Sequence, residues 1–211
     1  MANLDVQIQD LVGETMTDQN AMDTFLSDGL AQLYNILPPN KLAECATSTT
    51  LSNSPATLDL DTGTIGPILS VVRKNSRGFS QICRQVSSSM SSRITDTEDL
   101  MHVTDSDPVY FINNAVLNVY PDPTASQTAD VYYLPLTSID ASAGSTIDNL
   151  SNDMQYIVVL YAAIKSAEHL LAEEEDAELY TPMITSLKQD YAQAIQTIGA
   201  NMKQSGGKGE S

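Results

Sequence analysis

Residues 152–199, NDMQYIVVLYAAIKSAEHLLAEEEDAELYTPMITSLKQDYAQAIQTIG, decide the fold of this chain. Their first part contains YIVVLYAAI (156–164), which is apolar all round and therefore predicts a helix that is covered on most sides. The second part keeps apolar residues at helical spacing after Thr181-Pro182, a capping residue followed by the proline typical of a first helical turn. The stretch predicts two long helices joined by an acidic turn, and Gly199 is the expected stop.

A second helical pattern opens the chain. Residues 4–12 suit a short helix that Gly13 interrupts, and Asp18 can then cap a longer helix. Pro38-Pro39 ends that helix, because proline cannot continue the hydrogen-bond ladder. The apolar stripe of the longer helix recurs every three or four residues: Met22, Leu26, Leu30, Leu33 and Leu37.

The middle of the chain is typical of short strands separated by turns. Residues 46–66 predict loops and an edge strand, and residues 68–86 predict a hairpin whose loop contains Gly78. The serine-dense stretch 87–99 predicts a long loop or mobile tip. Residues 109–134 predict an antiparallel meander of three strands, with Asn113-Asn114 in the first tight turn. Residues 137–150 predict a mostly polar linker.

We therefore expect an α+β fold, in which the N- and C-terminal helices form a bundle and an antiparallel β subdomain is inserted between them. The expected bundle comprises residues 1–45 and 150–199, and the β-rich insertion comprises residues 46–149. Residues 200–211 are expected to form a flexible C-terminal tail.

The composition argues against several classes of function. The net charge of −17 argues against general binding to nucleic acid, because phosphates repel such a surface. Cys45 and Cys83 have no metal-ligand or C-x-x-C spacing and are expected to be reduced, partly buried thiols. The first twelve residues lack the basic start of a signal peptide, and the apolar run 156–164 is far shorter than the roughly 20 residues of a spanning helix. We expect a soluble protein made in a cytosol, with no membrane partner.

Half of the ten basic residues fall within one stretch that contains no acid, residues 73–93. Three interpretations remain open: a solvated hairpin, a positive surface that docks on an acidic neighbouring subunit, or a contact with passing DNA. A complete separation of charge would favour head-to-tail contact between copies, which builds rings. The basic residues are Arg73, Lys74, Arg77, Arg84 and Arg93.

Acidic residues form the complementary candidate surface. The run Glu173, Glu174, Glu175 and Asp176 lacks the spacing and the central glycine of a calcium loop, so a solvated turn is the simpler interpretation. The same holds for the Asp-Ser-Asp stretch 105–107, which suits a turn better than a metal site. Neither histidine has a neighbouring motif that would form a catalytic triad. The sequence predicts no enzyme, no cofactor and no metal.

Four segments carry a resemblance to a known family. They are LYNILPP (33–39), VVRKNSRGFSQICRQV (71–86), DPVYFINNAVLNVYPDP (107–123) and NDMQYIVVLYAAIKSAEHLL (152–171). Over residues 18–198 the chain resembles the head-to-tail connector (adaptor) proteins of tailed bacteriophages.

The resemblance implies a homo-oligomeric ring, commonly dodecameric, in the virion neck below the portal protein, synthesised in the host cytoplasm. Such a ring extends the DNA channel, through which double-stranded DNA passes without specific binding, and meets the next neck or tail protein. Residues 18–37 and 151–198 would form the ring body, in which adjacent subunits help to cover helix 156–164, and residues 56–134 would form the β insertion. The C-terminal segment would dock on the portal through Met202, Lys203, Gln204 and Lys208.

Two alternatives stay open at this stage. The chain could be another phage neck component, such as a head-completion or tail-terminator protein, although those tend to be smaller or more wholly β. A small hydrolase is the alternative from another class, and it would need one deep cleft with converging polar groups.

Overall fold

The computed structural model describes residues 3–14, 18–136, 139–144, 146–174 and 177–205, and for Glu174 and residues 199–205 it describes the backbone alone. Contacts divide the chain into a helical unit, Met1–Pro38 with Ser138–Ser211, and a β unit, Pro39–Thr137. The α+β fold is confirmed, since along the chain the strands fall between the N- and C-terminal helices. The expected divisions lay at residues 45/46 and 149/150. The contacts instead place the short helix α3 (Pro39–Glu44) in the β unit and the segment after Thr137 in the helical unit.

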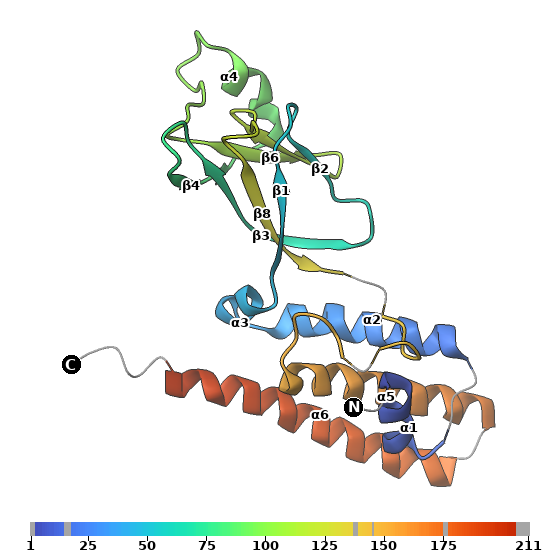
Figure 1. Ribbon diagram of the computed structural model, residues 1–211. Coiled ribbons are helices and arrows are strands. Elements are labelled where there is room, and N and C mark those ends of the chain that lie inside the picture. The colour runs from blue at the N-terminus through green and yellow to red at the C-terminus, as the bar shows by residue number, and fades with distance from the viewer. Residues whose placement is uncertain (1–2, 15–17, 137–138, 145, 175–176, 206–211) are drawn as a thin grey trace. The chain divides into compact units, whose positions relative to one another are not determined.

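The helical unit is built around α5 (Asn152–Glu174), which packs against α1 (Leu4–Val12), α2 (Gln19–Ile36) and α6 (Ala177–Ser205) (Figure 1). The predicted ends of the first two helices are confirmed. Gly13 follows α1 with φ +80°, and Asp18 Oδ1 accepts a hydrogen bond from the Ala21 N–H at 3.1 Å.

The apolar run in α5 is covered within one chain. Ile157, Val158, Leu160, Ala162 and Ala163 are each at most 1% exposed. Their neighbours are α1, α2 and α6, which surround α5. Adjacent subunits were expected to help cover this run, but three helices of the same unit already cover these five residues, and among the large apolar side chains described in α5 only Tyr156 is exposed, at 47%.

The described residues of the predicted polar linker, 139–144 and 146–150, are attached to the helices. Ile139, Ala141 and Ile147 are buried, and the Ala141 N–H donates to Asp23 Oδ1 on α2 at 2.9 Å. The Leu4 N–H at the start of α1 donates to the Gly144 carbonyl at 2.9 Å. Three apolar side chains spaced along a polar stretch thus fasten it to the helices.

Helix α6 is longer than predicted at both ends. It begins at Ala177 and carries Pro182 inside it, because the fully buried Tyr180 packs as a helical residue ahead of the proline. At the other end the helix passes Gly199 and reaches Ser205, since one glycine costs a helix only about 1 kcal/mol. The predicted stop at Gly199 is therefore wrong.

The β unit contains two four-stranded sheets (Figure 1). Their facing sides enclose a core that includes Val71, Val131, Tyr110, Leu117 and Val119. One sheet has the strand order β1 (Thr47–Leu51), β8 (Ala129–Pro135), β3 (Ile65–Lys74) and β4 (Ser80–Ile82). The other has the order β2 (Thr57–Asp59), β7 (Val116–Tyr120), β6 (Val109–Asn113) and β5 (Arg84–Gln85).

Both predicted hairpins are present, but the second strand of the first hairpin ends at Ile82, because Arg84 and Gln85 pair with β6 in the other sheet. Gly78 has φ +80° in the loop between β3 and β4. In the β6–β7 hairpin the turn lies one residue later than predicted: Asn113 pairs with Val116, and the positive φ values belong to Asn114 and Ala115. The third meander strand was predicted wrongly, because β8 pairs with β1 and β3 in the other sheet.

The serine-dense stretch is an ordered cover rather than a loop or mobile tip. It forms the 3-10 turn η1 (Ser88–Met90) and the short helix α4 (Ser91–Thr95). Ile94 is 2% exposed and packs with Val103, Val109 and Phe111, against the side of β6 that faces away from the main core. The serine-rich composition does not predict this role, because the contact is made by a few apolar residues among the serines.

Candidate functional site

The basic cluster divides into three kinds of residue, and Arg73 belongs to the interior of the β unit. Its side chain is 2% exposed, and Nη1 lies 3.0 Å from Asp105 Oδ1. Nη2 donates to Gln127 Oε1 at 2.9 Å. Arg73 thus joins β3 to the loop before β6 and to the loop between β7 and β8, and it is not available to a neighbouring subunit.

Arg84 and Arg93 lie at the surface, and each has an acidic partner in the same unit. Arg84 Nη2 is 3.0 Å from Asp107 Oδ2. Arg93 donates to both oxygens of Asp99 at 2.9 and 3.2 Å, and these hydrogen bonds lower the pKa of Asp99. Exposed pairs of this kind contribute little stability, but they reduce the positive charge that the sequence stretch 73–93 suggests.

Lys74 and Arg77 remain exposed at the tip of the β3–β4 hairpin, and no ion pair joins either to another residue of the described chain. Beside them are two of the most exposed apolar side chains of the β unit, Phe79 at 64% and Ile82 at 77%. Strand β4 is the last in its sheet, so one of its edges has no strand partner among the described residues. We call Lys74, Arg77, Phe79 and Ile82 the hairpin-tip patch.

The acidic candidate surface belongs to the helical unit. Glu173 is exposed, and its Oε1 lies 3.3 Å from His169 Nε2. The side chain of Glu174 and all of Glu175 and Asp176 lie outside the described residues. Charge is nonetheless unevenly divided: the helical unit carries 17 acids and four bases, a net −13, whereas the β unit carries ten acids and six bases, a net −4.

The predicted portal-docking residues are placed only in part. Met202, Lys203 and Gln204 lie on the last turns of α6, where a flexible tail was expected, and their side chains are not described. Lys208 lies outside the described residues.

The hydrolase alternative requires one deep cleft with converging polar groups, so the hollows of the two units are relevant to it. The β unit has an open groove of about 490 Å³, lined by Ile94, Tyr120 and the exposed His102 among others. Asp105 also lines it, but its carboxylate already holds Arg73. A smaller cavity of about 40 Å³ lies in the helical unit.

Within the described ranges, no group of three or more histidines, cysteines or carboxylates is placed to hold a metal ion. The same ranges contain no helix with the length and apolar character needed to cross a bilayer. Cys45 and Cys83 are thiols, as predicted, but they are more deeply buried than expected, at 0% and 4% exposed, and burial raises the pKa of the Cys83 thiol to about 12. A thiol held neutral in this way is a poor nucleophile.

Comparison with known proteins identifies the family. A family model described as SU10 adaptor protein matches residues 2–208, nearly the whole chain, whereas no curated protein matches. The resemblance seen in the sequence is thereby confirmed, and the family implies a structural component of the virion rather than an enzyme. The chain belongs to the SU10 adaptor protein family of phage head–tail adaptors.

Proposed function

We propose that this protein acts by assembling into a closed homo-oligomeric ring in the virion neck, below the portal protein, where it extends the DNA channel toward the next neck or tail component. The observation that carries the proposal is the family match over residues 2–208. The resemblance implies a ring of commonly twelve copies, and a closed ring of that size requires contact between unlike surfaces of adjacent subunits. Two unlike surfaces are available in this chain.

The first surface is the hairpin-tip patch. It presents two cations, Lys74 and Arg77, that have no ionic partner among the described residues, next to two exposed apolar side chains. Burying Phe79 and Ile82 against a partner would contribute about 1.5–3 kcal/mol each before the cost of association. The cations would set the orientation of the contact and accelerate encounter.

The second surface is the helical unit of the neighbouring copy, with its net charge of −13. Opposite charge makes it the natural acceptor of the hairpin-tip patch. A contact between two different patches is heterologous, and repeated around an axis it closes into a ring. Glu173, Glu174, Glu175 and Asp176 belong to this acidic surface by sequence.

The same negative charge suits a channel wall. Double-stranded DNA carries about one negative charge per 1.7 Å, so an acidic wall repels it and allows it to pass without binding. The end of α6 would meet the portal through Met202, Lys203 and Gln204, with Lys208 beyond them, and the opposite face of the ring would meet the next neck or tail protein.

Charge reversal at the hairpin tip tests the contact. The double variant Lys74→Glu/Arg77→Glu should keep the circular dichroism spectrum of the parent and lose ring formation, as measured by native mass spectrometry in the presence of the portal protein. The control is Lys41→Glu/Lys188→Glu, which makes the same change in net charge at two lysines away from the hairpin, one partly buried and one exposed. If the hairpin variant still forms rings, or if the control loses them equally, the hairpin-tip contact is wrong.

A further inference from the structure

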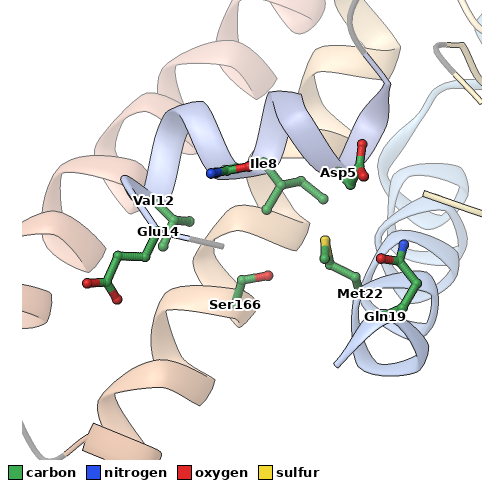
Figure 2. Close-up of a pocket in the computed structure, with 8 residues that line it drawn as sticks. Asp5, Ile8, Val12, Glu14, Gln19, Met22 and Ser166 are labelled. Atoms are coloured by element: carbon green, nitrogen blue, oxygen red, sulfur yellow. The ribbon is translucent and has the colours of Figure 1, made fainter. Parts of the chain in front are cut away.

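A small, partly enclosed cavity of about 40 Å³ lies between α1, the start of α2 and α5 (Figure 2). Apolar side chains form part of its wall, but polar ones are as prominent, with two carboxylates, two amides and one hydroxyl. The apolar lining residues are Ile8, Val12 and Met22. The polar lining residues are Asp5, Gln9, Glu14, Gln19 and Ser166.

Two polar atoms at this cavity are buried without a partner. Ser166 Oγ and Gln19 Nε2 have no hydrogen bond to any residue of the described chain. Ser166 is only 1% exposed and lies on α5 beside the fully buried Ala167. Figure 2 shows the Ser166 hydroxyl directed toward the side of the cavity that Met22 and Gln19 form. Leaving a buried polar group unpaired is unfavourable, so two such atoms at one cavity call for an occupant.

We propose that this cavity binds an ordered water molecule that bridges Ser166 Oγ on α5 and Gln19 Nε2 on α2. The volume suffices, because a water needs roughly 10–15 Å³ of such space and two to four polar partners. The amide nitrogen of Gln19 is a donor and requires an acceptor. A cation would be repelled by that N–H donor, and an apolar occupant would leave both atoms without a hydrogen bond. A water oxygen can form a hydrogen bond with each of them.

Carboxylates at the cavity can supply the remaining hydrogen bonds. Asp5 Oδ1 already accepts from the Val6 N–H at 2.7 Å, and Glu14 Oε2 accepts from the buried Tyr180 hydroxyl at 2.5 Å. Each carboxylate still has free lone pairs that can accept a hydrogen bond from a water O–H. The bridge would fasten the start of α2 to the middle of α5, while Glu14 joins the end of α1 to α6.

The direction in which Ser166→Ala shifts the melting temperature tests the proposal. If Ser166 Oγ is dry and unpaired, Ser166→Ala removes a buried unsatisfied group and raises the melting temperature of the helical unit. If the hydroxyl binds the bridging water, the same variant lowers it by about 2–4 °C. Ser186→Ala is the matched control, because Ser186 is an exposed serine on α6 and reports the gain from alanine's helix propensity alone.

A second variant tests the bridge itself. Gln19→Met keeps the length of the side chain and removes the amide, with the exposed Gln189→Met as its control. One shared water predicts that Gln19→Met also lowers the melting temperature and that the double variant with Ser166→Ala is little worse than the more affected single variant. Fully additive losses, or a Ser166→Ala melting temperature at or above that of Ser186→Ala, would overturn the proposal. So would a crystal structure of the unchanged chain with no density between the two atoms.

Discussion

Arg73 and Asp105 form an ion pair in which the guanidinium is buried and the carboxylate is not: their side chains are 2% and 37% exposed, and Nη1 lies 3.0 Å from Oδ1. Removing one partner is therefore expected to change the stability of the β unit by a different amount than removing the other. Without Asp105, a guanidinium is left inside the β unit with only neutral oxygens around it. Without Arg73, the carboxylate can be hydrated where it stands.

We predict that Asp105→Ala destabilises the β unit more than Arg73→Met does, by up to about 3–5 kcal/mol, because it leaves a buried charge unpaired. Urea denaturation followed by circular dichroism measures both. The control is Asp107→Ala, whose partner Arg84 is 54% exposed and whose loss should cost less than about 1 kcal/mol. Equal costs for Asp105→Ala and Asp107→Ala would show that the burial of Arg73 has no energetic consequence.

The basic stretch shows what sequence alone could and could not reveal about the site. Counting within residues 73–93 found no acid, and the sequence could not show that Asp99, Asp105 and Asp107 fold back onto three of the five cations. Only alternation of burial along β3 distinguishes the inward Arg73 from the outward Lys74. Phe79 and Ile82 are recognisable as apolar in the sequence. Their exposure is not, because it depends on β4 being the last strand of its sheet.

Gly29 marks the close crossing of α2 over α5. A Cβ placed there would stand 3.0 Å from Tyr161 Cδ1 and 3.3 Å from the Val158 carbonyl oxygen. Gly29→Leu should therefore force the helices apart and unfold the helical unit at a temperature at least several degrees lower, as measured by thermal melting at 222 nm. Asn35→Leu, an exposed position on the same helix, should melt near the parent. A Gly29→Leu protein that melts with the control would mean that the crossing is looser than the structure shows.

Leu160 tests whether α5 is covered within one chain. It is fully buried, so Leu160→Asp places a carboxylate among apolar side chains and should cost several kcal/mol even in a dilute monomer. Tyr156→Asp, on the same helix at a position 47% exposed, should cost little. Equilibrium denaturation over a range of protein concentrations distinguishes the cases: if the loss at Leu160 appeared only where subunits associate, the helix would be covered by neighbours instead.

The buried thiol of Cys83 gives a pH prediction. An ordinary thiol ionises near 9 and the pKa of Cys83 is raised to about 12, chiefly by burial. The neutral form is favoured in the folded state, so this contribution to stability is complete below pH 9 and is lost as the pH rises from about 9 toward 12. In a Cys45→Ala background, the folded chain should react at most slowly with a chromogenic thiol reagent at pH 8 and fast in denaturant. Rapid reaction of the native protein would contradict the burial of Cys83.

Local patterns predicted more of the helical unit than of the β unit. Periodicity and caps found α1, α2 and α5, because both signals lie within one segment. Strand pairing is a choice between distant segments, which is why β8 was predicted in the wrong sheet. The same reasoning explains the serine-dense stretch, in which Ile94 meets Val109 and Phe111 only after the chain has folded.

Light scattering gives the decisive test of ring assembly on the portal. The chain should be measured by size exclusion with multi-angle detection, alone and after mixing with the portal protein of the same phage. Ring assembly on the portal predicts one discrete complex whose mass corresponds to a fixed number of chains bound to each portal ring. A chain that elutes at its monomer mass of 22.8 kDa both alone and in the presence of the portal would contradict it.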